Sequence, residues 1–280
     1  MLFLLQLWHE QVKLFARRRT WIGFGVFGLV YALVVFGMTR PHPREMFRRA
    51  IEKNGYGFEA YFSGLTLGLQ MMIWTGFLLG GLFLALVSGD VVSKEVEDGT
   101  MRMMLCRPAS RWRIGTLKYL TCMIYTFVLA VFIGLSALTL GALYRGLGGL
   151  FAVEPFAHLF ALYPFGPGLA RYLGALPVLA VGLLSFSSVG FLFSCLNMKP
   201  AAATIVTLTL LFFDFIFHKV PYFENYQPYF LTPHMSAWLQ VFVPHIPWRQ
   251  IGADVAYLGA LDVTFVVIGI VAFSQRDFKG

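Results

Sequence analysis

The amino-acid sequence predicts an all-α integral membrane protein with six transmembrane helices, and three observations support this fold class. Of the 280 residues, 58% are hydrophobic and only 13% are charged, whereas an ordinary soluble domain carries about 25% charged residues. Long stretches without a charged side chain recur along the chain, and about 20 such residues are enough to cross a bilayer. The polar segments between them are short, which predicts a single transmembrane domain over residues 1–280.

The first twenty residues predict an amphipathic helix that lies in the headgroup layer of the membrane. Leu4, Leu7, Trp8 and Leu14 recur at helical spacing, while most charged side chains fall elsewhere. Three consecutive arginines, residues 17–19, then precede the first span. Basic clusters of this kind are retained on the cytoplasmic side, so the sequence predicts a cytoplasmic N-terminus.

The uncharged runs place the six spans at about residues 20–38, 64–87, 118–144, 172–196, 201–217 and 255–273. An even number of spans puts both termini on the cytoplasmic side. Glycines spaced four apart in the second span, Gly64 with Gly68 and Gly76 with Gly80, permit close packing of helices. Inner segments then hold 13 Lys and Arg residues and outer segments nine, which agrees with this orientation.

Three outer segments connect the spans. Residues 40–59 carry five basic side chains and a short apolar stripe, which predicts a second surface-lying helix on the outer leaflet. Residues 145–171 are rich in Gly, Pro and aromatic residues and predict an interfacial loop. Residues 219–249 contain five prolines but only three charges. Such an apolar, interrupted segment predicts short half-helices in the outer leaflet between spans five and six.

Common sequence motifs of catalysis and nucleotide binding are missing. The sequence contains no phosphate-binding loop of the form GxxxxGK[ST], no GxSxG or HExxH motif, and no set of Cys and His residues at metal-ligand spacing. We therefore expect no cofactor or metal in this chain and no enzymatic activity of the chain by itself. The net charge of +8 is scattered over many loops, so we expect no binding to nucleic acid.

Two acidic residues fall inside predicted spans. Asp262 lies within the sixth span and Asp214 near the outer end of the fifth, where a carboxylate costs several kcal/mol unless it is paired or hydrated. Both are candidates for a substrate path or a gate. Alternatively, each reaches the outer headgroups or hydrogen-bonds a neighbouring helix, and the sequence leaves these alternatives open.

The densest run of mixed charge is residues 93–113, between the second and third spans. Gly99 is a suitable helix terminator, and Ser110 is a suitable N-cap for the helix that follows. The intervening residues combine methionines with arginines, and methionine-rich patches suit adaptable protein contacts. This run therefore predicts an inward-facing elbow that contacts a soluble partner.

The elbow resembles the signature of type-2 ABC exporter permeases. The matching residues are Glu95-x-x-x-Gly99-Thr100, Met104-Leu105-x-x-Pro108-x-Ser110-Arg111, Lys118 at the start of a span, and a C-terminal Phe273-x-x-Arg276-Asp277. The general layout agrees over nearly all of the chain. The resemblance implies a half-transporter that forms a homodimer or a heterodimer with a similar permease. It is driven by separate ATPase subunits, which bind ATP and Mg²⁺.

The resemblance also implies roles for particular residues. The elbow corresponds to a cytoplasmic coupling helix that sits in a cleft of the ATPase, and residues 219–249 correspond to half-helices near the exit gate. The residues expected to couple to the ATPase are Glu95, Gly99, Thr100, Arg102, Met104, Arg107 and Arg111.

The expected function is therefore that of a permease subunit of an ATP-driven exporter in the cell (inner) membrane. The scarcity of polar residues in the spans favours an amphiphilic or lipidic substrate, but its identity stays open. One alternative is a secondary transporter that uses Asp262 as a proton relay, which would work without an ATPase. Others are a membrane enzyme acting on lipid-linked substrates and a membrane anchor or assembly factor.

Overall fold

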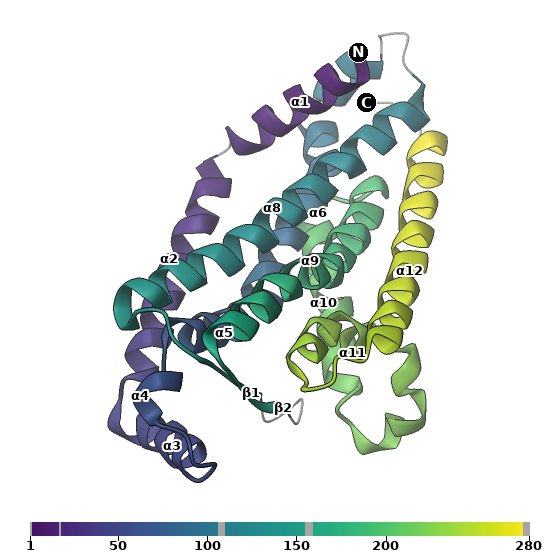
Figure 1. The fold of residues 1–280 in the computed structure, drawn as a ribbon. Helices are drawn as coiled ribbons and strands as arrows, with labels where there is room; N and C mark the ends of the chain where they lie inside the picture. The colour runs from purple at the N-terminus through teal and green to yellow at the C-terminus, as the bar shows by residue number, and fades with distance from the viewer. Residues whose placement is uncertain (1, 17, 106–109, 155–158, 277–280) are drawn as a thin grey trace.

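A computed structural model of the chain describes residues 2–16, 18–105, 110–154 and 159–276 and shows a bundle of long helices (Figure 1). Among these residues, six helical segments are long and apolar enough to cross a membrane. They are α2 (Arg18–Met38), the continuous run α5–η1–α6 (Gly64–Glu97), α8 (Arg111–Arg145), α9 (Phe165–Cys195), α10 (Pro200–Phe217) and α12 (Trp248–Gln275). The predicted all-α membrane fold is confirmed.

The helices around the elbow extend beyond the predicted spans. In the second span, α5 (Gly64–Thr75) continues through one π-helical turn, η1 (Gly76–Gly80), into α6 (Gly81–Glu97). Helix α8 begins at Arg111, well before the predicted start near residue 118. The acidic half of the charged run therefore belongs to α6, and the elbow itself is reduced to residues 98–110.

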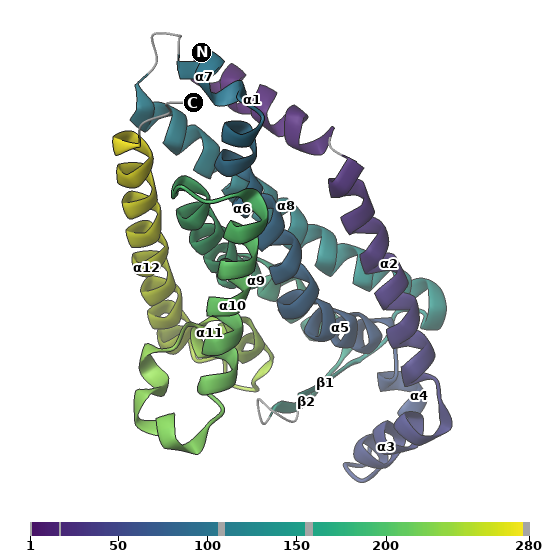
Figure 2. The same ribbon diagram turned by 180° about the vertical axis from the view of Figure 1, so that it is seen from behind.

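The bundle has two distinct ends (Figures 1 and 2). The first and last described residues lie at one end, together with α1 (Leu2–Phe15) and the short helix α7 (Thr100–Leu105). This end is termed the terminal end. The opposite end, termed the hairpin end, carries α3 (Pro41–Glu52), α4 (Phe58–Tyr61), β1 (Leu150–Glu154), β2 (Leu159–Tyr163), η3 (Pro221–Tyr229), α11 (Leu231–Met235) and η4 (Ser236–Phe242).

Helix α9 lies at the centre of the bundle and packs against α6, α8, α10 and α12. Some polar side chains inside this core are paired between helices: the Tyr172 hydroxyl donates to the Gly134 carbonyl over 2.8 Å. The hydroxyls of Thr126 and Ser187 lie 2.7 Å apart. In an apolar surrounding such pairs fix the relative position of helices, because an unpaired polar group there is costly.

Helices α5 and α8 approach each other at glycine, as the spacing of Gly64 and Gly68 predicts. A Cβ atom added to Gly64 would lie 2.6 Å from backbone atoms of α8, and one added to Gly141 would lie 2.3 Å from the Gly64 carbonyl oxygen. Neither position therefore has room for a side chain. The second pair, Gly76 and Gly80, faces side chains rather than backbone.

The expectation of a plain interfacial loop at residues 145–171 was wrong. Strands β1 and β2 form an antiparallel hairpin in which Leu150 is opposite Tyr163. The Thr66 hydroxyl accepts from the Phe151 amide over 2.8 Å, which ties β1 to α5. Phe151 and Leu159 are buried while Phe160 is exposed, so the hairpin has an inner apolar face that supports it against the helices.

Helix α3 forms where the sequence predicts a short helix, and part of its apolar stripe packs against the protein. Ile51 is fully buried, and the Phe47 ring packs edge-on against the rings of Phe62 and Phe151. Met46 of the same stripe is 60% exposed. Part of the basic charge of α3 is neutralised by ion pairs, namely Arg44 with Glu59, Arg48 with Glu52 and Arg49 with Glu45.

Candidate functional site

A cluster of four charged side chains, with Glu95 and Lys118 buried at its centre and Lys13 partly exposed, lies where α6 enters the elbow. The Glu95 side chain is only 2% exposed and accepts hydrogen bonds from the ammonium groups of Lys13 and Lys118. Lys118 is fully buried; its Nζ lies 2.7 Å from Glu95 Oε1 and 2.5 Å from Glu10 Oε2. Two negative and two positive charges thus balance, which is the condition for burying charge without a large penalty.

This ion cluster, defined as Glu10, Lys13, Glu95 and Lys118, joins three helices. Glu10 and Lys13 come from α1, Glu95 from α6 and Lys118 from α8. Gln11 adds a further link, because its side-chain amide donates to the Thr121 carbonyl of α8 over 3.1 Å. The cluster therefore holds α1 and the end of α6, where the elbow begins, against α8.

The position of Glu95 differs from the expectation that it shapes a surface for a partner. Its carboxylate faces the interior, where it accepts from Lys13 and Lys118 and holds the end of α6 against α1 and α8. Its partners Lys13 and Lys118 are 82 and 23 residues away in the chain, and no local pattern pairs them. One sequence signal did exist: Lys118 stands inside what is a continuous 35-residue helix, where a lone lysine requires a partner.

The turn of the elbow is made by glycine, as predicted. Asp98 caps the end of α6, and Gly99 follows with φ of +72°, a left-handed conformation that glycine adopts without strain. The Thr100 hydroxyl donates back to the Glu95 carbonyl over 3.2 Å. The chain therefore reverses sharply from α6 into α7.

Helix α7 has one methionine turned inward and one turned outward. Met101 is fully buried in a cluster with Val92 of α6, Phe191 of α9 and Phe273 of α12, whereas Met103 is 67% exposed. The described elbow thus carries an internal anchor and an exposed apolar side chain two residues apart. The side chains of Arg102 and Met104, and all of Arg107, lie outside the described part of the structure.

The start of α8, where the elbow ends, is held in place by Arg111. Ser110 caps α8, accepting from the Arg113 amide over 3.3 Å, as predicted. The Arg111 guanidinium donates to the carbonyls of Ser274 and Arg276 at 3.0 and 2.7 Å, where the last carbonyls of α12 need donors. Arg111 therefore joins the start of α8 to the end of α12.

Arg276 continues this connection to α9. Its guanidinium donates to the Leu196 carbonyl over 3.0 Å and to the Asn197 side chain over 2.8 Å. Burial lowers the pKa of the Arg276 guanidinium from its usual value, but an arginine remains charged at any physiological pH. The ends of α8, α9 and α12 are thus tied together directly behind the elbow.

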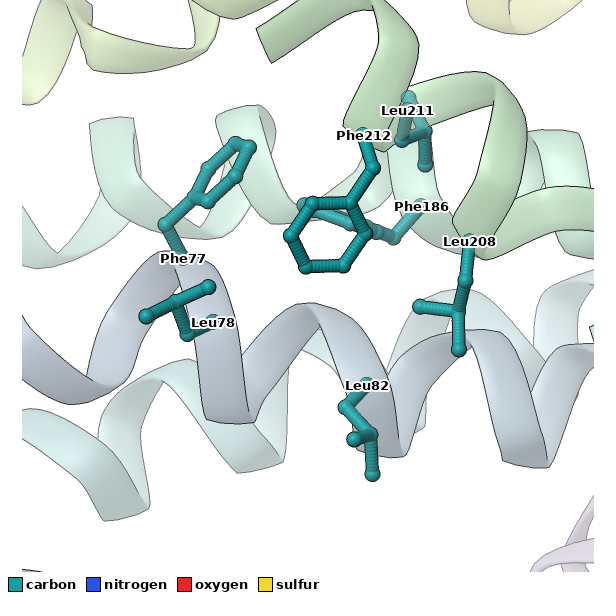
Figure 3. Close-up of a pocket in the computed structure, with 7 residues that line it drawn as sticks. All are labelled: Phe77, Leu78, Leu82, Phe186, Leu208, Leu211 and Phe212. Atoms are coloured by element: carbon teal, nitrogen blue, oxygen red, sulfur yellow. The ribbon is translucent and has the colours of Figure 1, made fainter. Parts of the chain in front are cut away.

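A small, partly open apolar pocket, here termed the groove, lies between η1–α6 and α10 (Figure 3). It is lined by Phe77, Leu78, Leu82, Phe186, Leu208, Leu211 and Phe212. Phe186 comes from α9 and lies between the two flanking helices. Every lining side chain is a hydrocarbon, so the groove offers no group to hold a charged substrate.

The two intramembrane acids do not line this groove. Asp214 accepts three hydrogen bonds from the start of α11, from the Leu231 amide at 2.9 Å and from the amide and hydroxyl of Thr232 at 2.7 and 2.6 Å. Asp214 therefore anchors the short helices between α10 and α12. Asp262 lies half-way along α12 and is only 2% exposed.

The short helices at the hairpin end are held by further polar contacts. The Arg171 guanidinium donates to the carbonyls of Val241 and Pro244 at 2.6 and 2.9 Å. Asp254 of α12 lies 2.7 Å from the His234 ring and accepts from the Gln240 amide over 3.0 Å. These contacts fix the segment predicted as half-helices to both α9 and α12.

A family model described as ABC-2 family transporter protein matches residues 6–213. This chain belongs to the ABC-2 transporter family. The match contains the ion cluster and the whole elbow, whereas Asp214 and α12 lie beyond it. With its six long apolar helices, this ABC-2 family chain is a multi-pass membrane protein.

The chain is similar to an uncharacterized protein of Bacillus subtilis strain 168, YhcI, with 23% identity over 192 residues. The alignment covers 57% of this chain and 60% of that protein. The ABC-2 family chain is thus matched over little more than half the length of either protein.

Proposed function

We propose that this chain is the membrane-spanning permease subunit of an ATP-driven exporter in the cell membrane. In this proposal the terminal end faces the cytoplasm, and a separate ATP-binding subunit docks on the elbow. Membership of the ABC-2 transporter family supports the proposal. The sequence itself lacks a phosphate-binding loop, so the energy of ATP would have to arrive from another chain, which would bind ATP and Mg²⁺.

The observation that carries the proposal is that α7 has one methionine buried in the bundle and another exposed on its surface. Met103 projects from the bundle while Met101, two residues earlier, is fully buried among α6, α9 and α12. An exposed flexible apolar side chain suits contact with another protein. A buried neighbour on the same short helix means that a partner pressing on Met103 displaces the core of the bundle.

The contacts at the two ends of the elbow determine which helices such a displacement would move. The ion cluster links the end of α6 to α1 and α8. Arg111 and Arg276 link the start of α8 to α12 and α9. Closely packed interiors transmit small displacements because they compress little. ATP-driven movement of the partner would therefore tilt several spans at once.

The scarcity of charged residues in the spans favours an apolar or amphiphilic cargo. Asp214 and Arg171 would hold the short helices that close the path at the hairpin end. The resemblance to exporter permeases adds that the chain pairs with a second permease, as a homodimer or a heterodimer.

Photo-crosslinking from the elbow tests the docking. A photoreactive phenylalanine placed at Met103 in the native membrane is expected to capture a protein that contains a phosphate-binding loop, identified by mass spectrometry. The matched control is the same residue at Leu143, which is 84% exposed near the other end of α8. Docking on the elbow would be refuted if the ATPase were crosslinked to position 143. It would also be refuted if the ATPase were crosslinked to other positions of the chain but not to position 103.

A further inference from the structure

Asp262 is a buried acid without a counter-charge. It lies half-way along α12, is only 2% exposed, and neither carboxylate oxygen has a hydrogen-bond partner among the described residues. A carboxylate in the centre of a bilayer-spanning bundle costs several kcal/mol when it is left ionised and unpaired. The folded state therefore requires something that neutralises this charge.

The neighbours of Asp262 are oxygen atoms of the adjacent helix. The hydroxyls of Ser185 and Ser188 on α9 face the carboxylate, and the Ser185 hydroxyl is itself buried without a partner among the described residues. Ser188 also lies 3.1 Å from the Tyr119 hydroxyl of α8. Several oxygens thus converge between α9 and α12, and three of them have no partner.

Among the described residues, no basic side chain pairs with Asp262. Tyr119, with Cys122 beside it, is the titratable neighbour on α8, and α9 contributes hydroxyls only. Helices α11 and η4 meet α12 around Asp254, nearer the hairpin end. Within the described residues, Asp262 forms no ion pair with any of the charged groups on these elements.

We propose that Asp262, with Ser185 and Ser188, forms a binding site for one monovalent cation, H⁺ or Na⁺, between α9 and α12. One carboxylate surrounded by neutral hydroxyls balances a single positive charge, whereas a divalent cation would leave an uncompensated charge in the membrane. A proton would let the acid donate to the unpaired Ser185 hydroxyl. A sodium ion would use the carboxylate and hydroxyl oxygens as ligands, which are the hard donors that such ions prefer.

Thermal unfolding of the full chain in lipid nanodiscs tests this site, and no ATPase is needed. In the first arm NaCl replaces choline chloride at fixed ionic strength and pH, and in the second arm the pH is raised without sodium. A Na⁺ site predicts an unfolding midpoint that rises with sodium by a shift on the order of 5 °C. An H⁺ site predicts a midpoint that falls as the pH rises, because the emptied site leaves a buried unpaired charge.

Three variants assign the effect to Asp262. Asp262→Asn has the same shape without the charge, so it is expected to fold and to lose the response of whichever arm the wild type shows. Ser185→Ala is expected to weaken a sodium response. Thr264→Val, on the exposed side of α12, is expected to respond like the wild type. If the wild type and Asp262→Asn respond equally in both arms, or neither responds, the site does not exist.

Discussion

At the scale of single residues, the buried charged side chains of the ion cluster depend on their ion-pair partners. Glu95 is held by two lysines and Lys118 by two glutamates, so these two buried charges are satisfied only while their partners are present. Removing one partner of a buried pair is strongly destabilising because it leaves an uncompensated charge. The ion cluster therefore keeps α1, α6 and α8 in one arrangement, and the loss of a single partner is expected to destabilise it.

Lys118→Met tests this dependence. The substitution leaves Glu10 and Glu95 close together with Lys13 as their remaining cation, and we expect it to lower the free energy of unfolding by about 3–5 kcal/mol. The measurement is chemical unfolding in detergent. Lys94→Met is the matched control, because Lys94 pairs with Glu97 and Asp98 at the surface and its loss is expected to change stability little. Equal unfolding midpoints for the two variants would contradict a stabilising ion cluster.

The roles of these residues were only partly predictable from the sequence. Charge made Glu95 look like part of an exposed surface, and its burial depends on Lys13 and Lys118, which the chain brings together only in the folded bundle. Asp262 stands out in the sequence because it interrupts an apolar run. The groups that face it, on α9, could not be derived from a periodic pattern.

At the scale of elements, the short helices between α10 and α12 depend on one carboxylate. Helix α11 has only five residues and could not persist alone, since isolated short helices are unstable in water. Asp214 accepts from both amides of its first turn, which supplies the capping that the helix lacks in its own sequence.

Asp214→Ala is expected to loosen this segment while the long helices remain intact. Loss of a cap costs about 1–2 kcal/mol, so amide hydrogen exchange over residues 231–243 should accelerate roughly tenfold or more, by the free-energy equivalence of stability and protection. Glu224→Ala, an exposed acid in η3, serves as the control and should leave the exchange rates unchanged. Unaltered protection in Asp214→Ala would show that other contacts carry α11.

Element boundaries show where sequence patterns lose information. The hairpin Leu150–Glu154 with Leu159–Tyr163 was missed because glycines and prolines on both sides predict loops, and its strands are only five residues long. Tertiary contacts decide in its favour, since the Phe151 amide bonds to Thr66 and its ring packs on Phe47. By contrast, Gly99 and Ser110 were predicted correctly because helix caps depend on local chemistry.

At the scale of the whole molecule, the six apolar helices followed directly from composition, because a bilayer imposes a minimum length of uncharged chain. Their arrangement around α9 did not follow. It depends on close approaches such as Gly64 with Gly141 and on the arginines that join the ends of α8, α9 and α12. These contacts hold the spans together in one packed bundle.

The affinity of the ATP-binding subunit for this chain in lipid nanodiscs is the measurement that tests the account most directly. We predict that the subunit binds the wild type and that Met103→Arg weakens binding by about tenfold or more, as expected when a contact of about 1.4 kcal/mol is lost. Tyr222→Arg, which alters an 82% exposed residue at the hairpin end, should bind like the wild type. Unchanged affinity of Met103→Arg, or a loss that Tyr222→Arg shares, would contradict coupling through the elbow.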